Sequence, residues 1–469
     1  MASISLSRIV SHWTAIQPDR VALDHLGDRR TWAELESRTN RLARAYELLG
    51  VKADDFVTVA LPNGCEFVEA CLAIWKLGAT PQPISSKLPK FERDQIIELG
   101  QPTLVVGVDD DEYAPTPCLH KGFVPDAVLP DSALPERTAT SFKAMTSGGS
   151  TGRPKLIVSK LPAAWDPEDP YLEIVNQGTM LIPGPLYHNG PFLWAMIALF
   201  KGCTIVIATR FDAEQVLEQI ETTGVDIVYL VPTMMRRIWA LPEDVRTKYD
   251  LSSLRAVWHL AAPCPAWLKE AFIEWMGAEV IWEDWLKHRG SVGRPVETCE
   301  MKIVGETGET LQPGEVGEVY MRPLSGPGST YQYLGAEAKI IDGGWESLGD
   351  LGWMDADGFL YLSDRLSDMV LSGGANIYPA EVEAALDAFP GVRSSAVIGL
   401  PDEDLGARLY AIVDYPEGTP DEAAMLAHLS ERLVRYKIPR SFEWVCEPLR
   451  DDAGKVRRKA LREARLVAP

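Results

Sequence analysis

Short apolar runs alternate with helical patterns along the first half of the chain, and this alternation limits the fold more than any other feature. The run FVTVALP at 56–62 is followed by the helical segment CEFVEACLAIWKLG at 65–78. The same arrangement returns downstream, where the runs TMLIPGP, TIVIATR and VDIVYLVP are bounded by helical patterns such as DAEQVLEQIETTG. Strands that alternate with helices form parallel sheets covered by helices. The sequence therefore predicts an α/β fold.

The sequence pattern changes at about Arg294, where short segments separated by glycine and proline begin. Such spacing predicts an antiparallel sheet or a small β-barrel-like subdomain appended to the α/β part. A strand, a Gly-Gly loop and a helix follow within 361–386. We interpret SSAVIGLPDEDLGARLYAIVDYP at 394–416 as a βα unit, followed by the helical segment 421–439 and a basic tail. These elements suffice for a small C-terminal α+β domain.

The length of 469 residues is too great for one compact core and favours several domains or subdomains. We expect a large N-terminal domain over 1–364, built from two parallel-sheet α/β subdomains and the β-barrel-like subdomain. A small C-terminal domain is expected over 365–469, with the boundary near Asp364–Ser367.

Charge and cysteine content exclude several classes of protein. The formal net charge is −21, which argues against nucleic-acid and anionic-membrane partners because both require a basic patch. The seven cysteines are odd in number and form no CxxC pair, so we expect reduced, mostly buried thiols. The N-terminus predicts an amphipathic helix instead of a signal peptide, and the apolar stretch LWAMIALF is too short to span a membrane. We therefore expect a cytoplasmic monomer or homodimer.

Residues 146–155 read TSGGSTGRPK and combine three glycines with hydroxyl and cationic side chains. Backbone N–H groups beside glycine, together with hydroxyls and cations, suit a polyphosphate. The segment is not a Walker A loop, because the GxxxxGK[ST] ending is absent. The alternative interpretation is a flexible surface turn. The residues that we assign to a phosphate-binding loop are Thr146, Ser147, Gly148, Gly149, Ser150, Thr151, Gly152 and Lys155.

Two further segments follow this loop in order, GWESLGDLGWMDADGFLYLSDR at 344–365 and DDAGKVRRKAL at 451–461. Together the three motifs resemble those of the adenylate-forming acyl-CoA synthetase, luciferase and adenylation-domain superfamily, over essentially the whole chain. The resemblance implies that ATP and a carboxylate form an acyl-adenylate and pyrophosphate. A thiol, usually coenzyme A, then displaces AMP. It also implies that the C-terminal domain is mobile and rotates between the two steps.

The resemblance assigns roles to residues of the second and third motifs. Asp350 is matched to the carboxylate that accepts hydrogen bonds from ribose, and Arg365 to a cation at ribose or phosphate; each could instead form a surface ion pair. Ser367 matches the hinge, where the family usually has Asp or Lys. Lys455 matches the catalytic lysine of adenylation, and the alternative is a cation of a solvated basic helix.

Further assignments concern adenine, the acid and coenzyme A. The segment HLAAPCP at 259–265 resembles the wall that lies against adenine. His188 matches a residue at the mouth of the acyl pocket, where it orients the acyl carboxylate or lies near the thiol, and the alternative is a packing role. The Ser-Gly-Gly loop at 372–374 matches the lining of the pantetheine tunnel, where glycine permits close backbone approach. The adenine residues are Ala261, Ala262 and Pro263, and the coenzyme A residues are Ser372, Gly373 and Gly374.

One family motif is missing from the chain. Members normally carry Tyr-Gly-x-Thr-Glu before the ribose Asp, and its Thr contacts the α-phosphate while its Glu helps to hold Mg²⁺. Here GAEVIWE at 277–283 runs directly into DWLKHRGSVGRP. Three explanations stay open: adenylation is lost and thioester formation from a preformed acyl-adenylate is kept; Glu283 or Asp284 takes over the metal role; or the given chain omits a loop.

We therefore expect an acyl-CoA ligase of secondary or lipid metabolism that uses ATP, coenzyme A and, where adenylation is retained, Mg²⁺. The apolar run PFLWAMIALF after His188 and the 14 tryptophans indicate a bulky hydrophobic acid, and the resemblance is nearest to members that act on bile acids, steroids or terpenoids. Two other hypotheses remain. One is a carrier-protein-dependent adenylation protein, and the other is a non-catalytic nucleotide-binding homologue.

Overall fold

The computed structural model describes residues 3–148, 154–171, 174–260, 264–277, 284–365, 368–372, 375–402, 405–416, 418–451 and 455–466. The chain divides into two compact units. The first unit comprises residues 1–261, 270–282 and 328–338, and the second comprises residues 262–269, 283–327 and 339–469. The division into an N-terminal domain over 1–364 and a C-terminal domain over 365–469 stays a prediction.

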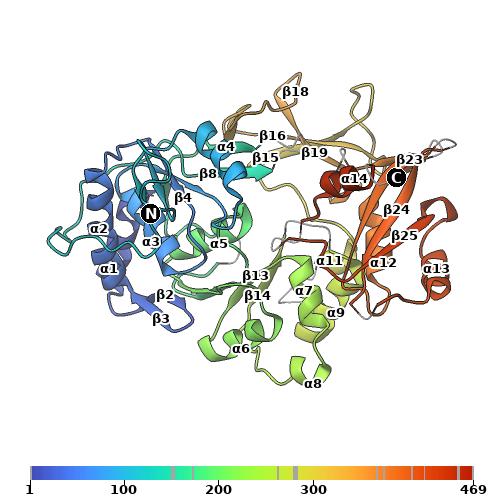
Figure 1. The fold of residues 1–469 in the computed structure, drawn as a ribbon, viewed down its shortest axis with the longest axis horizontal. Coiled ribbons are helices and arrows are strands. Elements are labelled where there is room, and N and C mark those ends of the chain that lie inside the picture. The colour runs from blue at the N-terminus through green and yellow to red at the C-terminus, as the bar shows by residue number, and fades with distance from the viewer. Residues whose placement is uncertain are drawn as a thin grey trace. The chain divides into compact units, whose positions relative to one another are not determined.

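The largest sheet of the first unit has six strands, of which five run parallel and the last, β3, returns antiparallel beside β2 (Figure 1). In spatial order the strands are β14 (Ala256–His259), β13 (Ile227–Leu230), β11 (Thr179–Ile182), β12 (Thr204–Ile207), β2 (Val21–His25) and β3 (Asp28–Thr31). All four residues of β13 are buried. This uniform burial is typical of a parallel strand covered on both faces.

A second sheet of the first unit has four parallel strands. In spatial order they are β5 (Thr80–Pro83), β4 (Phe56–Val59), β6 (Leu104–Val106) and β7 (Cys118–Leu119). Helix α3 (Cys65–Lys76) contacts strands of both sheets, and all its residues except Glu66 are buried. Most of these residues are apolar, and the two buried charges of the helix, Glu69 and Lys76, form ion pairs with Arg30 and Arg38 and with Glu36. The predicted α/β class with two parallel sheets is confirmed.

Among the remaining helices before residue 280, those predicted at the N-terminus and at DAEQVLEQIETTG are present, and several others were not predicted. Helix α2 begins with a capping box, in which the Thr31 hydroxyl accepts from the Glu34 N–H and the Glu34 carboxylate accepts from the Thr31 N–H. Of the described helices, none has the length and hydropathy needed to cross a bilayer. The helices are α1 (Leu6–Ile16), α2 (Trp32–Leu48), α4 (Lys90–Gly100), α5 (Asn189–Phe200), α6 (Ala213–Thr223), α7 (Pro232–Trp239), α8 (Glu243–Arg246) and α9 (Ala266–Met276).

Two small antiparallel sheets complete the first unit. One has three strands in the order β17 (Tyr331–Leu334), β9 (Pro154–Ser159) and β8 (Ala144–Gly148). The other pairs β1 (Ile4–Ser5) with β10 (Ala164–Trp165).

The second unit contains the antiparallel sheet predicted after Arg294. Its five strands pair antiparallel throughout. They are β15 (Cys299–Val304), β16 (Gly317–Pro323), β19 (Trp345–Met354), β18 (Ile340–Ile341) and β20 (Leu360–Arg365). The short helix α11 (Asp284–Lys287) precedes this sheet in the chain.

The last hundred residues form a helix-covered sheet, but the predicted βα unit at 394–416 is wrong. β23 (Ser394–Asp402) and β24 (Gly406–Asp414) pair antiparallel along their whole length, and β25 (Ser441–Val445) pairs parallel with β24. The connection between β23 and β24 is too short for a crossover helix, so the two strands form a hairpin. The other elements are β21 (Val370–Ser372), β22 (Ala375–Ile377), α12 (Pro379–Asp387), α13 (Glu422–Ser430), the 3₁₀ helix η1 (Arg435–Lys437) and α14 (Arg458–Leu466).

Alternate residues of this sheet face two separate clusters. Val397 and Ala411 pack with α12 and α13, whereas Ile398 and Ile412 pack with Leu461 of α14. Successive side chains of a strand point to opposite faces, so helices cover both faces of the sheet.

Candidate active site

The predicted phosphate-binding loop joins two neighbouring antiparallel strands. Thr146 on β8 lies opposite Leu156 on β9, and Ser147 lies opposite Lys155. The backbones of Ser147 and Gly148 belong to the end of β8. The rest of the predicted loop, namely Gly149, Ser150, Thr151 and Gly152, lies outside the described residues.

Two side chains at the base of this loop have properties that suit a phosphate ligand. The Oγ1 atom of Thr146 is buried and has no hydrogen-bond partner within the described stretches. Such a hydroxyl costs roughly 1–3 kcal/mol unless something pairs with it, and a ligand oxygen can do so. The Nζ atom of Lys155 lies 4.1 Å from the ring centroid of Tyr333 on β17. A cation–π contact orients the ammonium group without neutralising its charge.

The N-terminal turn of α5 brings together His188 and a cation that sequence analysis missed. His188 is the N-cap residue of α5, and its ring centroid lies 4.4 Å from that of Tyr187. The Nζ atom of Lys143 donates to Oδ1 of Asn189, the first residue of the helix. Burial lowers the pKa of Lys143 to about 8. The turn therefore combines the positive end of a helix dipole with an ammonium group.

Aromatic rings pack along the first two turns of α5. The ring centroid of Trp194 lies 5.9 Å from that of Tyr229 on β13 and 5.0 Å from that of Trp258 on β14. Gly190 gives the Tyr229 hydroxyl its space, because a Cβ atom at position 190 would lie 2.1 Å from that oxygen. The hydroxyl is buried without a hydrogen-bond partner in the described part of the chain, and burial raises the pKa of Tyr229 to about 12.

The two residues assigned to ribose lie on neighbouring strands of the second unit. Asp350 on β19 is directly opposite Arg365, the last residue of β20. The antiparallel pairing of β19 and β20 therefore brings together Asp350 and Arg365, which are 15 positions apart in the sequence. The structure describes Arg365 by its backbone, and Ser367, the predicted hinge residue, lies outside the described residues.

Lys455, near the C-terminus, is held by Asp451. Its N–H donates to Oδ1 of Asp451 at 2.9 Å, and its carbonyl oxygen accepts from the Asp451 N–H at 3.0 Å. The side chain is exposed. Two backbone-directed contacts thus set the position of the residue and leave the side chain at the surface.

The residues assigned to coenzyme A fall on a tight hairpin. Ser372, the last residue of β21, pairs with Ala375, the first residue of β22. Gly373 and Gly374 connect these strands in the sequence and lie outside the described residues.

The adenine segment and the metal candidate are not described by the structure. Ala261, Ala262 and Pro263 follow β14, and they lie outside the described residues, as does Glu283. Over the ranges that the structure covers, no cluster of three or more His, Cys, Asp or Glu side chains could hold a metal ion.

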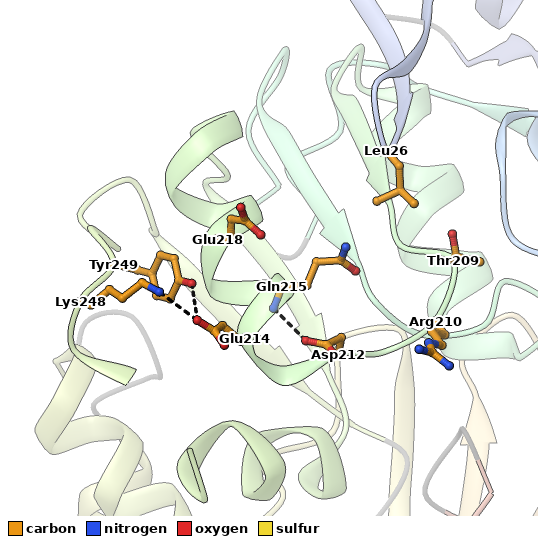
Figure 2. Close-up of a pocket in the computed structure, with 9 residues that line it drawn as sticks. All are labelled: Leu26, Thr209, Arg210, Asp212, Glu214, Gln215, Glu218, Lys248 and Tyr249. Atoms are coloured by element: carbon orange, nitrogen blue, oxygen red, sulfur yellow. Dashed lines mark hydrogen bonds and ion pairs between the residues drawn. The ribbon is translucent and has the colours of Figure 1, made fainter. Parts of the chain in front are cut away.

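A polar pocket of about 580 Å³ lies in the first unit beside the start of α6 (Figure 2). One of its three acidic residues, Glu214, accepts from Lys248 Nζ at 2.9 Å and from the Tyr249 hydroxyl at 2.8 Å. None of the residues assigned to the phosphate loop, adenine, ribose, coenzyme A or the acid lines this pocket.

Two protein-family models match the chain. The model of the AMP-binding enzyme family matches residues 10–334, and the model of the AMP-binding enzyme C-terminal domain matches residues 381–453. Together they cover most of the chain.

Several characterised proteins are similar over nearly the whole length. A feruloyl-CoA synthase of Amycolatopsis sp is 33% identical, with 94% of this chain and 95% of that protein covered. A CoA ligase of Rhodococcus jostii, named for a 7a-methyl-1,5-dioxo-octahydro-1H-inden-4-yl propanoyl group, is 32% identical over 93% of this chain and 94% of its own. The structure of o-succinylbenzoate CoA synthetase from Bacillus subtilis with its acyl-adenylate intermediate has a TM-score of 0.81, 26% identity and coverage of 98% and 99%.

Proposed function

The chain belongs to the AMP-binding enzyme family and is an acid-thiol ligase of its acyl-CoA ligase branch, and from this premise we propose that it converts a bulky hydrophobic carboxylic acid into a coenzyme A thioester through an acyl-adenylate. The observation that carries the choice of acid is the apolar, aromatic character of α5. Nine of its twelve residues are buried, and Trp194 packs between Tyr229 and Trp258.

The reaction proceeds in two displacements. A carboxylate oxygen attacks the α-phosphorus of ATP, and the bond to pyrophosphate breaks. The sulfur of coenzyme A then attacks the acyl carbon, and the bond to the AMP oxygen breaks. The first step turns a poor electrophile into an acyl group with a good leaving group, which makes thiol attack feasible.

We assign the residues of this chain to these steps as follows. Thr146 and Lys155 hold the β- and γ-phosphates, and Asp350 holds ribose. Lys455 stabilises the charge that develops on phosphoryl oxygens during adenylation. His188 orients the acyl carboxylate. Mg²⁺, when bound during adenylation, neutralises phosphate charge, and Glu283 is its proposed ligand.

Similar proteins support the choice of a bulky ring-bearing acid. The ligase of Rhodococcus jostii is named for an octahydro-indenyl propanoyl group, and the synthetase of Bacillus subtilis for o-succinylbenzoate. These names describe those proteins. They make polycyclic and aromatic acids the first to test here.

A second function has one observation in its favour. The Tyr-Gly-x-Thr-Glu motif is missing from the sequence, and its loss removes a contact to the α-phosphate and a metal ligand. Because phosphoryl transfer depends on such positioning and charge neutralisation, this variant would form thioesters from a preformed acyl-adenylate and coenzyme A without making the adenylate. A carrier-protein-dependent reaction is the remaining alternative.

Two assays on the purified full chain separate these functions. The first measures pyrophosphate release from ATP with a panel of aromatic, polycyclic and straight-chain acids. The second measures the coenzyme A thioester formed from the corresponding synthetic acyl-AMP. We expect activity in both assays, greatest with a polycyclic or aromatic acid. Thioester formation without pyrophosphate release would identify the non-adenylating variant, and acyl transfer to a carrier protein but not to coenzyme A would contradict both.

A further inference from the structure

The carboxylate of Glu383 on α12 holds both ends of the segment that carries Lys455. Only 3% of this residue is exposed. Its Oε2 atom accepts from Arg450 Nη2 at 3.0 Å, five positions before Lys455. The Nη2 atom of Arg458, three positions after Lys455, donates to both carboxylate oxygens at 2.9 Å. One buried anion therefore binds two guanidinium groups that lie on either side of Lys455 in the sequence.

Described residues at the two ends of the segment between these arginines contact each other. Arg450 and Val456 form an antiparallel bridge. Asp451 contacts Lys455 twice, through its own N–H and through its carboxylate, at 3.0 and 2.9 Å. The turn and its two arginine anchors thus form one connected structure, and the position of Lys455 depends on the point where that structure is attached.

The attachment point is packed against the core of the domain. The N–H of Val397 on β23 donates to Oε1 of Glu383 at 2.8 Å, and Val382 beside it is fully buried in the core of the sheet. Burial raises the pKa of Glu383, and Arg458 and Arg450 oppose this rise. A buried carboxylate is retained in the charged form only with such partners.

Arg458 also links this network to the predicted hinge region. Its Nη1 atom donates to Oδ2 of Asp368 at 2.7 Å. Asp368 follows the predicted hinge residue Ser367 directly in the sequence. The same guanidinium thus contacts both the anchor of the Lys455 turn and the segment at which the C-terminal domain is expected to rotate.

We propose that Glu383 is a positioning residue for Lys455: through Arg450 and Arg458 it sets where the Lys455 ammonium lies during adenylation. The proposal rests on the proposed function, in which Lys455 acts in adenylation and is not needed for thioester formation. Glu383 acts through the arginines and does not itself contact the reactants.

The test compares the two half-reactions in Glu383→Gln, which keeps the shape of the side chain and removes its charge. We expect adenylation, measured as pyrophosphate release at saturating ATP and acid, to fall at least about tenfold, since an ångström-scale misplacement of a catalytic group has effects of this order. Thioester formation from acyl-AMP should change by less than about twofold. An equal fall in both half-reactions, or unchanged rates in both, would leave their ratio the same and overturn the proposal.

Asp414→Asn is the matched control. Asp414 is the last residue of β24, which pairs with the strand β23 that Glu383 contacts. It is fully buried and binds Arg393 at 2.6 and 2.8 Å, but it has no bond to the Lys455 turn among the contacts described. Its replacement also breaks a buried ion pair. We expect it to lower the midpoint of urea unfolding while leaving the ratio of the two half-reactions unchanged.

A second measurement does not depend on catalysis and separates this proposal from the proposed function. Amide hydrogen exchange of the peptide that contains 450–456 should be at least about tenfold faster in Glu383→Gln than in wild type or in Asp414→Asn, because local opening becomes easier. Unchanged exchange in that peptide would overturn the proposal even if the enzyme adenylates. Faster exchange in a chain that releases no pyrophosphate would support the positioning by Glu383 and contradict only the adenylation step.

Discussion

At the scale of single residues, Lys143 shows how burial without an acidic partner changes an amine. Its Nζ atom donates to the neutral Asn189 side chain and lies 5.5 Å from the ring centroid of Phe142. No carboxylate pairs with it in the part of the chain that the structure describes. Burial alone lowers its pKa from 10.5 to about 8.

The lowered pKa of Lys143 should make the free energy of unfolding depend on pH. Between pH 8 and 10.5 the unfolded chain holds the Lys143 proton while the folded chain has lost it, so the free energy of unfolding rises with pH. At pH 7 we expect Lys143→Met to be about 1 kcal/mol more stable than wild type, and the difference should shrink by pH 10. Urea unfolding at several pH values measures both. Lys143→Arg is the control, because arginine stays charged throughout; a constant difference between wild type and Lys143→Met would contradict the assignment.

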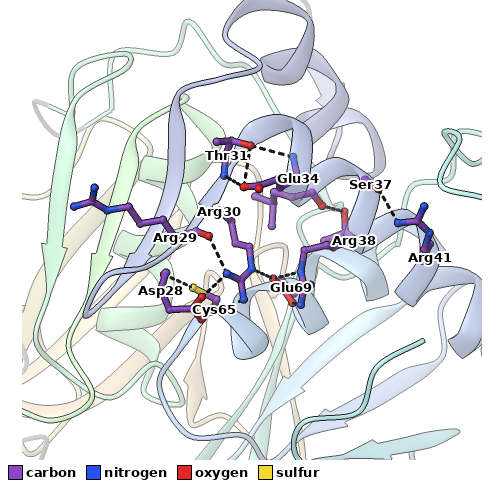
Figure 3. Close-up of polar contacts among 12 residues, drawn as sticks. Asp28, Arg29, Arg30, Thr31, Glu34, Ser37, Arg38, Arg41, Cys65 and Glu69 are labelled. Carbon is purple, nitrogen blue, oxygen red and sulfur yellow. Dashed lines mark hydrogen bonds and ion pairs between the residues drawn. The ribbon is translucent and has the colours of Figure 1, made fainter. Parts of the chain in front are cut away.

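At the scale of elements, buried charges join helices and strands that are distant in the sequence. Glu69 on α3 accepts from Arg30 of β3 at 2.9 Å and from Arg38 of α2 at 2.8 and 3.0 Å (Figure 3). Its side chain is only 5% exposed. One carboxylate therefore holds three elements together beside the capping box of α2.

Removal of this carboxylate should be costly. Glu69→Gln removes the carboxylate that binds Arg38 and one of the two carboxylates that bind Arg30, which also pairs with Asp28. We expect the free energy of unfolding to fall by roughly 1–3 kcal/mol, because charged groups that are partly buried lose a partner. The control is Asp131→Asn, which breaks the exposed pair with Arg41 at 2.7 Å and should cost less than about 1 kcal/mol. Urea unfolding of both variants gives the comparison. Equal losses would show that burial does not distinguish the two pairs.

At the scale of the whole molecule, the proposed reaction uses Lys455 in one half-reaction only. Lys455→Ala should lower pyrophosphate release by about 100-fold or more, the usual effect of removing a group that stabilises developing charge. Thioester formation from synthetic acyl-AMP should stay within about threefold of wild type, because the family resemblance implies that the C-terminal domain rotates and carries Lys455 out of the site before the thiol step. Parallel assays on the full chain measure both rates. A comparable loss in both would remove Lys455 from its proposed role.

The sequence predicted most of the fold because local patterns carry that information. Alternating strands and helices indicated two parallel sheets, and glycine and proline spacing indicated the antiparallel sheet after Arg294. The hairpin of β23 and β24 was misread as a βα unit. A strand such as β23 or β24, each of nine residues, has the same sequence pattern whether it pairs with the next strand in the chain or with a distant one. Only the short connection between β23 and β24 favoured the hairpin.

Sequence motifs led to the candidate site residues, whereas contacts that depend on packing were not predicted. Thr146, Lys155, Asp350 and Lys455 were assigned from the sequence, and their roles stay predictions. Several assigned residues, among them Ser150, Pro263 and Gly373, lie outside the described residues.

By itself, the sequence determined the family and the α/β fold class, because these depend on motifs and on short-range patterns of strands and helices. Only the tertiary structure decided which side chains meet. It placed Lys143 against Asn189, Tyr229 against Gly190, and Glu383 between Arg450 and Arg458. The physical reason is that these contacts join residues far apart in the chain, and their energies come from burial and charge pairing that arise only when the elements pack.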